Sequence, residues 1–177
     1  IYNCHLKPHI SQLMNKHTNI CLNVILDHSR HLLNRLHDNS IDVCFSYLAT
    51  NEISYKCIPY KTDEIIFVTN SQNIQFSNGI HNGEILHLPI IYSKFMPKSG
   101  FDWIHDIFPP HYVFQFTISV IKEIIPFLLQ YPYYAFLPRK LIEKELKDGL
   151  LIEIPLLDYH IPPLQSYIIM KSNAKYN

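Results

Sequence analysis

The chain has 177 residues, enough to bury a substantial core, and its 47% hydrophobic and 17% charged residues exclude a disordered or collagen-like protein. Lysine and arginine (15) balance aspartate and glutamate (15), so the chain lacks the basic excess with which proteins usually hold nucleic-acid phosphates. We therefore expect no direct contact with DNA, and the absence of a long apolar run predicts no membrane-spanning helix.

The start of the chain has neither an initiator methionine nor the charged-then-apolar pattern of a signal peptide. We interpret it as a segment from within a longer protein. The four cysteines form no CxxC pair, and most of them lie in apolar surroundings. Free, buried thiols are typical of a reducing compartment, which predicts a cytoplasmic location.

The first elements are predicted from hydrophobic spacing. Residues 3–15 show the period of an amphipathic helix, and the β-branched run at 19–26 predicts a strand. A second helix follows, with Ser29 as its expected N-cap and Asn39 as its C-terminal stop, before a buried strand at 41–47. This order predicts a β-α-β unit, the common link between parallel strands.

The middle of the chain alternates short strands with loops. Two strands are expected on either side of Pro59, the second at residues 64–69. A loop rich in glycine and asparagine leads to a short helix or turn at 84–87, and residues 89–93 form the next expected strand.

A helix beginning at Ser99 is then expected to run to the double proline after residue 108, followed by a strand at 112–118. The next helix should begin near Ser119, with Pro126 kinking it or starting a new turn.

The last third repeats the strand–helix–strand order. Residues 133–137 are an expected buried strand, and residues 139–147 an expected surface helix that stops at Gly149. Residues 151–155 alternate and predict the returning strand. Two rounds of strand, helix and strand favour two similar α/β lobes.

Four segments, in this order, resemble the effector-binding region of LysR-type transcriptional regulators: residues 29–48 (SRHLLNRLHDNSIDVCFSYL), 58–73 (IPYKTDEIIFVTNSQN), 88–108 (LPIIYSKFMPKSGFDWIHDIF) and 137–156 (LPRKLIEKELKDGLLIEIPL). Asp42 stands at the aspartate position of the family pattern, and the resemblance spans almost the whole chain. Where the family usually has Gly-x-Gly, this chain has QYPYY at 130–134.

The resemblance implies an α/β fold like that of type 2 periplasmic-binding proteins, with two lobes, each a mixed sheet flanked by helices. Lobe I would comprise residues 1–62 and 156–177, and lobe II residues 63–155. It also implies a non-catalytic domain that senses a small molecule between the lobes, with an anionic metabolite as the candidate class, and uses no cofactor. A homodimer or homotetramer would form through the first helix and residues 20–26, and DNA would be bound only by an amino-terminal winged helix-turn-helix.

Polar residues at helix starts and strand ends are the candidate effector ligands, because helix N-termini present unpaired N–H groups and open α/β sheets bind ligands beyond their strand ends. Simple capping is the competing explanation for each of them. The candidates are Asn3, Ser29, Ser46, Tyr47, Ser93, Lys94, Ser99, Thr117 and Ser119.

Other functions have weaker support. The eleven histidines invite a metal site, but no CxxC or HExxH spacing is present, so solvated or capping histidines are favoured. No GxSxG motif occurs, and Cys44 lies within an apolar strand, which argues against a nucleophilic enzyme. The alternative to a regulator is a solute-binding protein of a transporter with the same fold, against which the free cysteines argue.

Overall fold

The computed structural model describes residues 1–93 and 103–172, and the chain divides into two compact units. Unit 1 comprises Ile1–Thr62 and Gln165–Asn177, and unit 2 comprises Asp63–Leu164. The second boundary differs from the one expected from the sequence, because residues 156–164 belong to unit 2. Within the described residues, no helix has the length and apolar character needed to cross a membrane.

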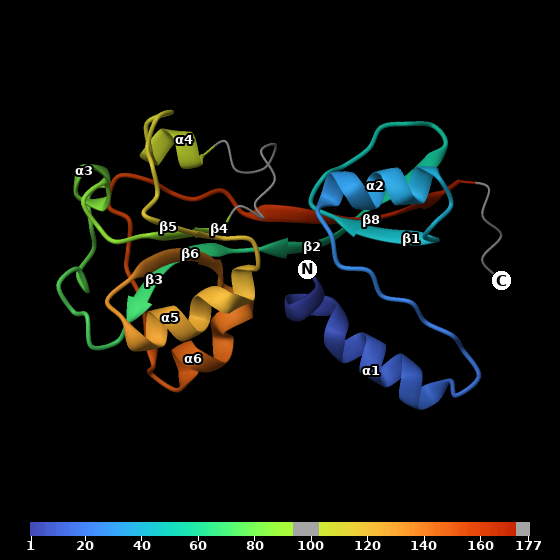
Figure 1. The fold of residues 1–177 in the computed structure, drawn as a ribbon, viewed down its shortest axis with the longest axis horizontal. Helices are drawn as coiled ribbons and strands as arrows, with labels where there is room; N and C mark the ends of the chain where they lie inside the picture. The colour runs from blue at the N-terminus through green and yellow to red at the C-terminus, as the bar shows by residue number, and fades with distance from the viewer. Residues whose placement is uncertain (94–102, 173–177) are drawn as a thin grey trace. The chain divides into compact units, whose positions relative to one another are not determined.

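Unit 1 is built on a sheet with the strand order β1-β8-β2 (Figure 1). The strands are β1 (Val43–Ser46), β8 (Leu164–Lys171) and β2 (Tyr55–Asp63). β1 runs antiparallel to β8 with Cys44 opposite Ile169, and both residues pack with Leu36 in the core. The predicted β-α-β unit with parallel strands is therefore wrong for unit 1, because β1 pairs with the end of the chain.

Three helical elements belong to unit 1: the π-helical turn η1 (Tyr2–Leu6), α1 (Lys7–Lys16) and α2 (Ser29–His37). The expected stop at Asn39 is confirmed. Asn39 has a positive φ of 65°, and the N–H groups of Asn39 and Ser40 donate to the carbonyls of Leu36 and Arg35. This is the Schellman arrangement, in which a left-handed residue satisfies the last helical carbonyls.

One strand prediction in unit 1 is wrong. Residues 19–26 form no strand, and their apolar side chains are largely exposed. A β-branched run favours the extended backbone, but a strand also requires a hydrogen-bonding partner. Of the two strands expected on either side of Pro59, the second, at residues 64–69, is confirmed as β3 (Ile65–Asn70), whereas the first is longer than expected, because β2 (Tyr55–Asp63) continues through Pro59. β2 lies at the edge of the described sheet, where the missing N–H of a proline is tolerated.

Unit 2 contains a three-stranded sheet, β6-β3-β7, and a parallel pair, β4-β5. A parallel bridge between Ile90 and Tyr134 lies next to β4 and β6. The order β4, α4, β5 forms a β-α-β unit, and the pairing of Tyr92 with Thr117 shows that its strands are parallel. The strands are β3 (Ile65–Asn70), β4 (Ile91–Ser93), β5 (Phe116–Ile118), β6 (Tyr134–Pro138) and β7 (Leu151–Glu153).

Both faces of the central strand β3 are covered, which explains its unbroken apolar run. Ile66 and Val68 pack with Leu128 of α5 on one face. Phe67 stacks with aromatic rings of β6 on the other, 5.4 Å from Tyr134 and 4.6 Å from Phe136. In Figure 1, α5 and α6 lie on one side of the sheet and α3 and α4 on the other. The helical elements are α3 (Asn82–Ile85), α4 (Ile104–Ile107), η3 (Ile121–Glu123), α5 (Ile124–Gln130), η4 (Arg139–Ile142) and α6 (Glu143–Lys147).

The boundaries of these helices follow proline and glycine. Pro126 lies in the first turn of α5, where a backbone N–H has no acceptor within the helix, so it starts a new turn as expected. Gly149 has a φ of 66°, and Leu150 donates to the carbonyl of Glu145, which confirms the expected stop after α6. The expected start at Ser99 lies outside the described residues.

Candidate functional site

Three of the candidate ligands of unit 1 meet where β1 ends and α2 begins. The backbone N–H of Tyr47 donates to the hydroxyl oxygen of Ser29 at 3.2 Å. The N–H of Leu48 donates to the hydroxyl oxygen of Ser46 at 2.8 Å, and Ser46 is fully buried. Two hydroxyl groups are thus fixed at the carboxyl end of a strand, the edge at which open α/β sheets bind ligands.

Ser29 does not cap α2 as expected. The N-cap is His28, without a side-chain cap, and the N–H of His28 itself donates to the carboxylate of Asp27 at 2.7 Å. His31 Nδ1 lies 3.0 Å from the same carboxylate oxygen. Asp27 thus accepts a hydrogen bond at the start of the helix, whereas the Ser29 hydroxyl accepts the N–H of Tyr47 and so connects α2 to the end of β1.

The remaining candidate of unit 1 is Asn3, an exposed residue of η1. The start of η1 lies next to the other candidates, because the amine of Ile1, the N-cap of η1, donates to the hydroxyl of Tyr47 at 3.1 Å. Among the candidates of unit 1, Ser29, Ser46 and Tyr47 are therefore brought together directly, and Asn3 through its neighbour.

The candidates of unit 2 lie at the ends of the parallel strands β4 and β5. Ser93 is buried and pairs in register with Ile118, and Thr117 is half-buried beside it in β5. The prediction that Ser119 starts a helix is wrong, since η3 begins at Ile121 with Val120 as its N-cap. Lys94 and Ser99 lie outside the described residues.

The candidate side chains are suited to binding a ligand rather than to catalysis. Hydroxyl and amide groups donate and accept hydrogen bonds but do not titrate near neutral pH. Burial raises the pKa of the Cys44 thiol to about 12, which keeps the thiol protonated and unreactive. Over residues 1–93 and 103–172, no group of three or more histidine, cysteine, aspartate or glutamate side chains is arranged to hold a metal ion.

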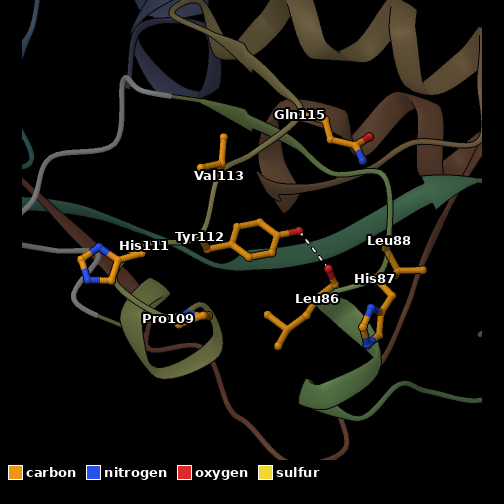
Figure 2. Close-up of a pocket in the computed structure, with 8 residues that line it drawn as sticks. All are labelled: Leu86, His87, Leu88, Pro109, His111, Tyr112, Val113 and Gln115. Carbon is orange, nitrogen blue, oxygen red and sulfur yellow. Dashed lines mark hydrogen bonds between the residues drawn. The ribbon is translucent and has the colours of Figure 1, made fainter.

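A hollow of about 620 Å³ in unit 2 was not predicted from the sequence. It lies between the loop that precedes β4 and the loop that precedes β5, and the Tyr112 hydroxyl donates to the Leu86 carbonyl at 3.1 Å across it. Figure 2 shows His87 and His111 on opposite sides of the Tyr112 ring. Both imidazoles are exposed and do not converge, so the hollow lacks the fixed polar groups of a built site.

The chain forms two α/β units and passes from one to the other twice, near residues 62–63 and 164–165. This organisation defines a class of protein, the two-lobed fold of type 2 periplasmic-binding proteins. The family model for the LysR substrate binding domain matches residues 1–176. The chain belongs to this family. Comparison with curated proteins finds no matching sequence.

Solved structures of LysR-type regulators share the fold. The regulatory domain of CrgA from Neisseria meningitidis has a TM-score of 0.78 at 12% identity, with 99% of this chain and 86% of that chain covered. A probable transcriptional regulator from Pseudomonas aeruginosa has a TM-score of 0.77 at 11% identity, with 98% and 58% covered. A mutant of OxyR from Corynebacterium glutamicum has a TM-score of 0.69 at 17% identity, with 98% and 55% covered.

This chain therefore spans little more than half the length of the latter two proteins. At these identities the likeness shows the fold, which agrees with the fold expected from the sequence.

Proposed function

We propose that the chain is the effector-sensing domain of a DNA-binding transcriptional regulator. The observation that carries the proposal is the family match over residues 1–176. Family membership favours the regulator over a solute-binding protein of a transporter. LysR regulatory domains are generally non-catalytic, and the unreactive Cys44 thiol supports the same conclusion for this chain.

The effector is proposed to bind to hydroxyl and backbone N–H groups from both units. Ser29, Ser46 and Tyr47 would serve in unit 1, and Ser93 and Thr117 in unit 2, since all five stand at or within one residue of a strand end or a helix start. Groups of this kind hold a carboxylate or phosphate without a buried countercharge, so a small anionic metabolite is the proposed class of effector.

Replacing Ser46 by alanine tests this site. Loss of its hydroxyl is expected to weaken effector binding by roughly 1–3 kcal/mol, about five- to a hundred-fold in Kd. Calorimetry with acetate, benzoate, citrate and inorganic phosphate would measure the parent first, followed by Ser46→Ala and Ser29→Ala.

The matched control is Ser40→Ala, because the Ser40 hydroxyl bonds only to Asp38 on the exposed turn after α2 among the contacts described. Full affinity in both site variants, with unchanged circular dichroism, would show that the effector does not use the group at the end of β1. If Ser40→Ala weakens effector binding as much as the two site variants do, the proposed site is also contradicted.

DNA binding is assigned to a winged helix-turn-helix domain outside this chain. The formal net charge of zero supports this, because binding to phosphates requires a basic surface. A cytoplasmic location is part of the same proposal, and the four free cysteines support it, since thiols stay reduced there.

We also propose that two copies associate through α1 and the segment that follows it. No residue of α1 is buried, and Leu13 and Met14 are each 41% exposed. Apolar side chains at alternate positions of the next segment are also exposed: Ile20 (36%), Leu22 (45%), Val24 (43%) and Leu26 (66%). Exposed apolar side chains gathered in neighbouring segments are typical of an interface, and a homo-oligomer is the commonest way to cover them.

Leu13→Glu is expected to raise the dimer dissociation constant roughly tenfold or more, because a carboxylate would face apolar side chains of the partner. Sedimentation velocity over a concentration series measures the shift towards monomer. Ser11→Glu is the control, since it adds the same charge to an exposed position of the same helix. An oligomer that survives Leu13→Glu unchanged would exclude α1 from the interface.

A further inference from the structure

The chain between β7 and β8 is fastened to unit 2 rather than crossing freely. Residues 155–160, which we call the return segment, make backbone bonds with Ile80: the Ile80 N–H donates to the Pro155 carbonyl at 2.9 Å, and the Leu157 N–H donates to the Ile80 carbonyl at 3.0 Å. Farther along, the Tyr159 hydroxyl donates to Asp106 of α4 at 2.6 Å. Figure 1 shows the segment running past α3 and α4 on its way to β8.

Asp158 is the side chain that attaches the return segment to α3. One of its oxygens accepts the backbone N–H of Asn82 at 3.0 Å, and the other lies 2.9 Å from Nδ1 of His81. The carboxylate of Glu84 completes the arrangement by accepting the N–H of His81 at 3.1 Å. The bond to Asn82 is independent of pH above the titration of Asp158, whereas the contact with His81 depends on the charge of the imidazole.

We propose that His81 and Asp158 form a pH-sensitive clasp that holds the return segment on unit 2 and tightens on acidification. The backbone bonds with Ile80 and the bond from Tyr159 to Asp106 persist whatever the charge of His81. Opening of the clasp therefore loosens the return segment without releasing it. The clasp thus sets how firmly the return segment is held on unit 2, and it does so whatever effector the domain binds.

Two charged groups face the imidazole, Asp158 from the return segment and Glu84 from α3, and both are acidic. The hydrogen bond to Asp158, more than the Coulombic attraction, raises the pKa of His81 above its ordinary value of 6.5. The hydrogen bond to His81, followed by that from Asn82, lowers the pKa of Asp158 below 3.8.

The raised pKa of His81 means that its contribution is complete below pH 6.5 and is lost as the pH rises through the folded-state pKa. The lowered pKa of Asp158 means that its contribution is present above pH 3.8 and is lost on stronger acidification. The clasp is therefore tightest between about pH 4 and 6.5. Near pH 8 the backbone bonds with Ile80, the Asn82 contact and the bond from Tyr159 to Asp106 remain.

Hydrogen–deuterium exchange of the peptide that covers residues 155–160 tests the clasp at pH 6.0 and pH 8.0. After correction for the intrinsic exchange rate, protection of the chain is expected to fall about two- to five-fold from the lower to the higher pH, the size typical of an exposed ion pair. His81→Gln and Asp158→Asn are each expected to abolish this pH dependence. In Asp158→Asn, the His81 pKa measured by NMR should fall back towards 6.5.

His87→Gln is the matched control, because His87 is an exposed imidazole close to α3 in the sequence. It is expected to leave the pH dependence intact. Equal protection of the parent at the two pH values overturns the proposal, as does the same loss in His87→Gln. The parent titration needs no substitution, so the test holds even if one variant fails to fold.

Discussion

Leu128→Ala is expected to lower the free energy of unfolding of unit 2 by about 2–5 kcal/mol, because it opens a cavity in the core of that unit. Leu128 is fully buried and packs in the cluster that contains Val68 of β3 and Leu137 of β6. A leucine at the contact between a helix and the central strand has few neighbours that can relax into the space, since the sheet is held by its own backbone bonds.

Leu129→Ala is the control for this substitution, since Leu129 is the next residue of the same helix and is 37% exposed. We expect a loss below about 1 kcal/mol, because little apolar surface leaves a packed environment. Urea denaturation followed by circular dichroism would measure both variants. Equal losses at the two positions would mean that α5 does not bury Leu128 against the sheet.

The features that the sequence predicted well depend on neighbours close in the chain. Asn39 and Gly149 stop their helices because a left-handed residue closes the last turn, and every group involved lies within six residues. The strand β3 was recognisable for a similar reason, since a run buried on both faces reads as continuous apolar sequence.

The failures concern partners that are distant in the chain. Residues 19–26 have strand composition, but the sheet of unit 1 takes the late strand β8 beside β1 instead, and β8 itself was not predicted. Ser29 is a residue type that commonly caps helices, yet its hydroxyl accepts the N–H of Tyr47. A local sequence pattern indicates which residue can form a hydrogen bond, but the fold determines which partner it bonds to.

The return segment shows the same limit at the boundary between the units. Pro155 was expected to end a strand, and the family resemblance implied a lobe boundary directly after it. The chain stays with unit 2 for several more residues because Ile80, His81 and Asp106 hold it, and none of these partners is close to it in sequence.

The fit of the return segment against the loop before α3 also makes Gly79→Ala strongly destabilising. Gly79 has a φ of 116°, which side chains rarely adopt, and an added Cβ would lie 2.5 Å from Cδ2 of Leu157 and 3.2 Å from the Pro155 carbonyl oxygen. We expect a loss of about 1–3 kcal/mol from the backbone conformation alone. The exposed Leu157 side chain can move aside, but the carbonyl is bonded to Ile80 and cannot do so without breaking that bond.

Gly83→Ala is the matched control, and the expected change has the opposite sign. Gly83 lies within α3, and nothing approaches its Cβ position within 4 Å. Alanine there should stabilise the chain by about 0.4–1 kcal/mol, because it restricts the unfolded chain and favours the helix. Thermal melts of the two variants would separate the causes. If Gly79→Ala gains stability like Gly83→Ala, the return segment does not press against this loop, and the clasp at His81 loses its structural basis.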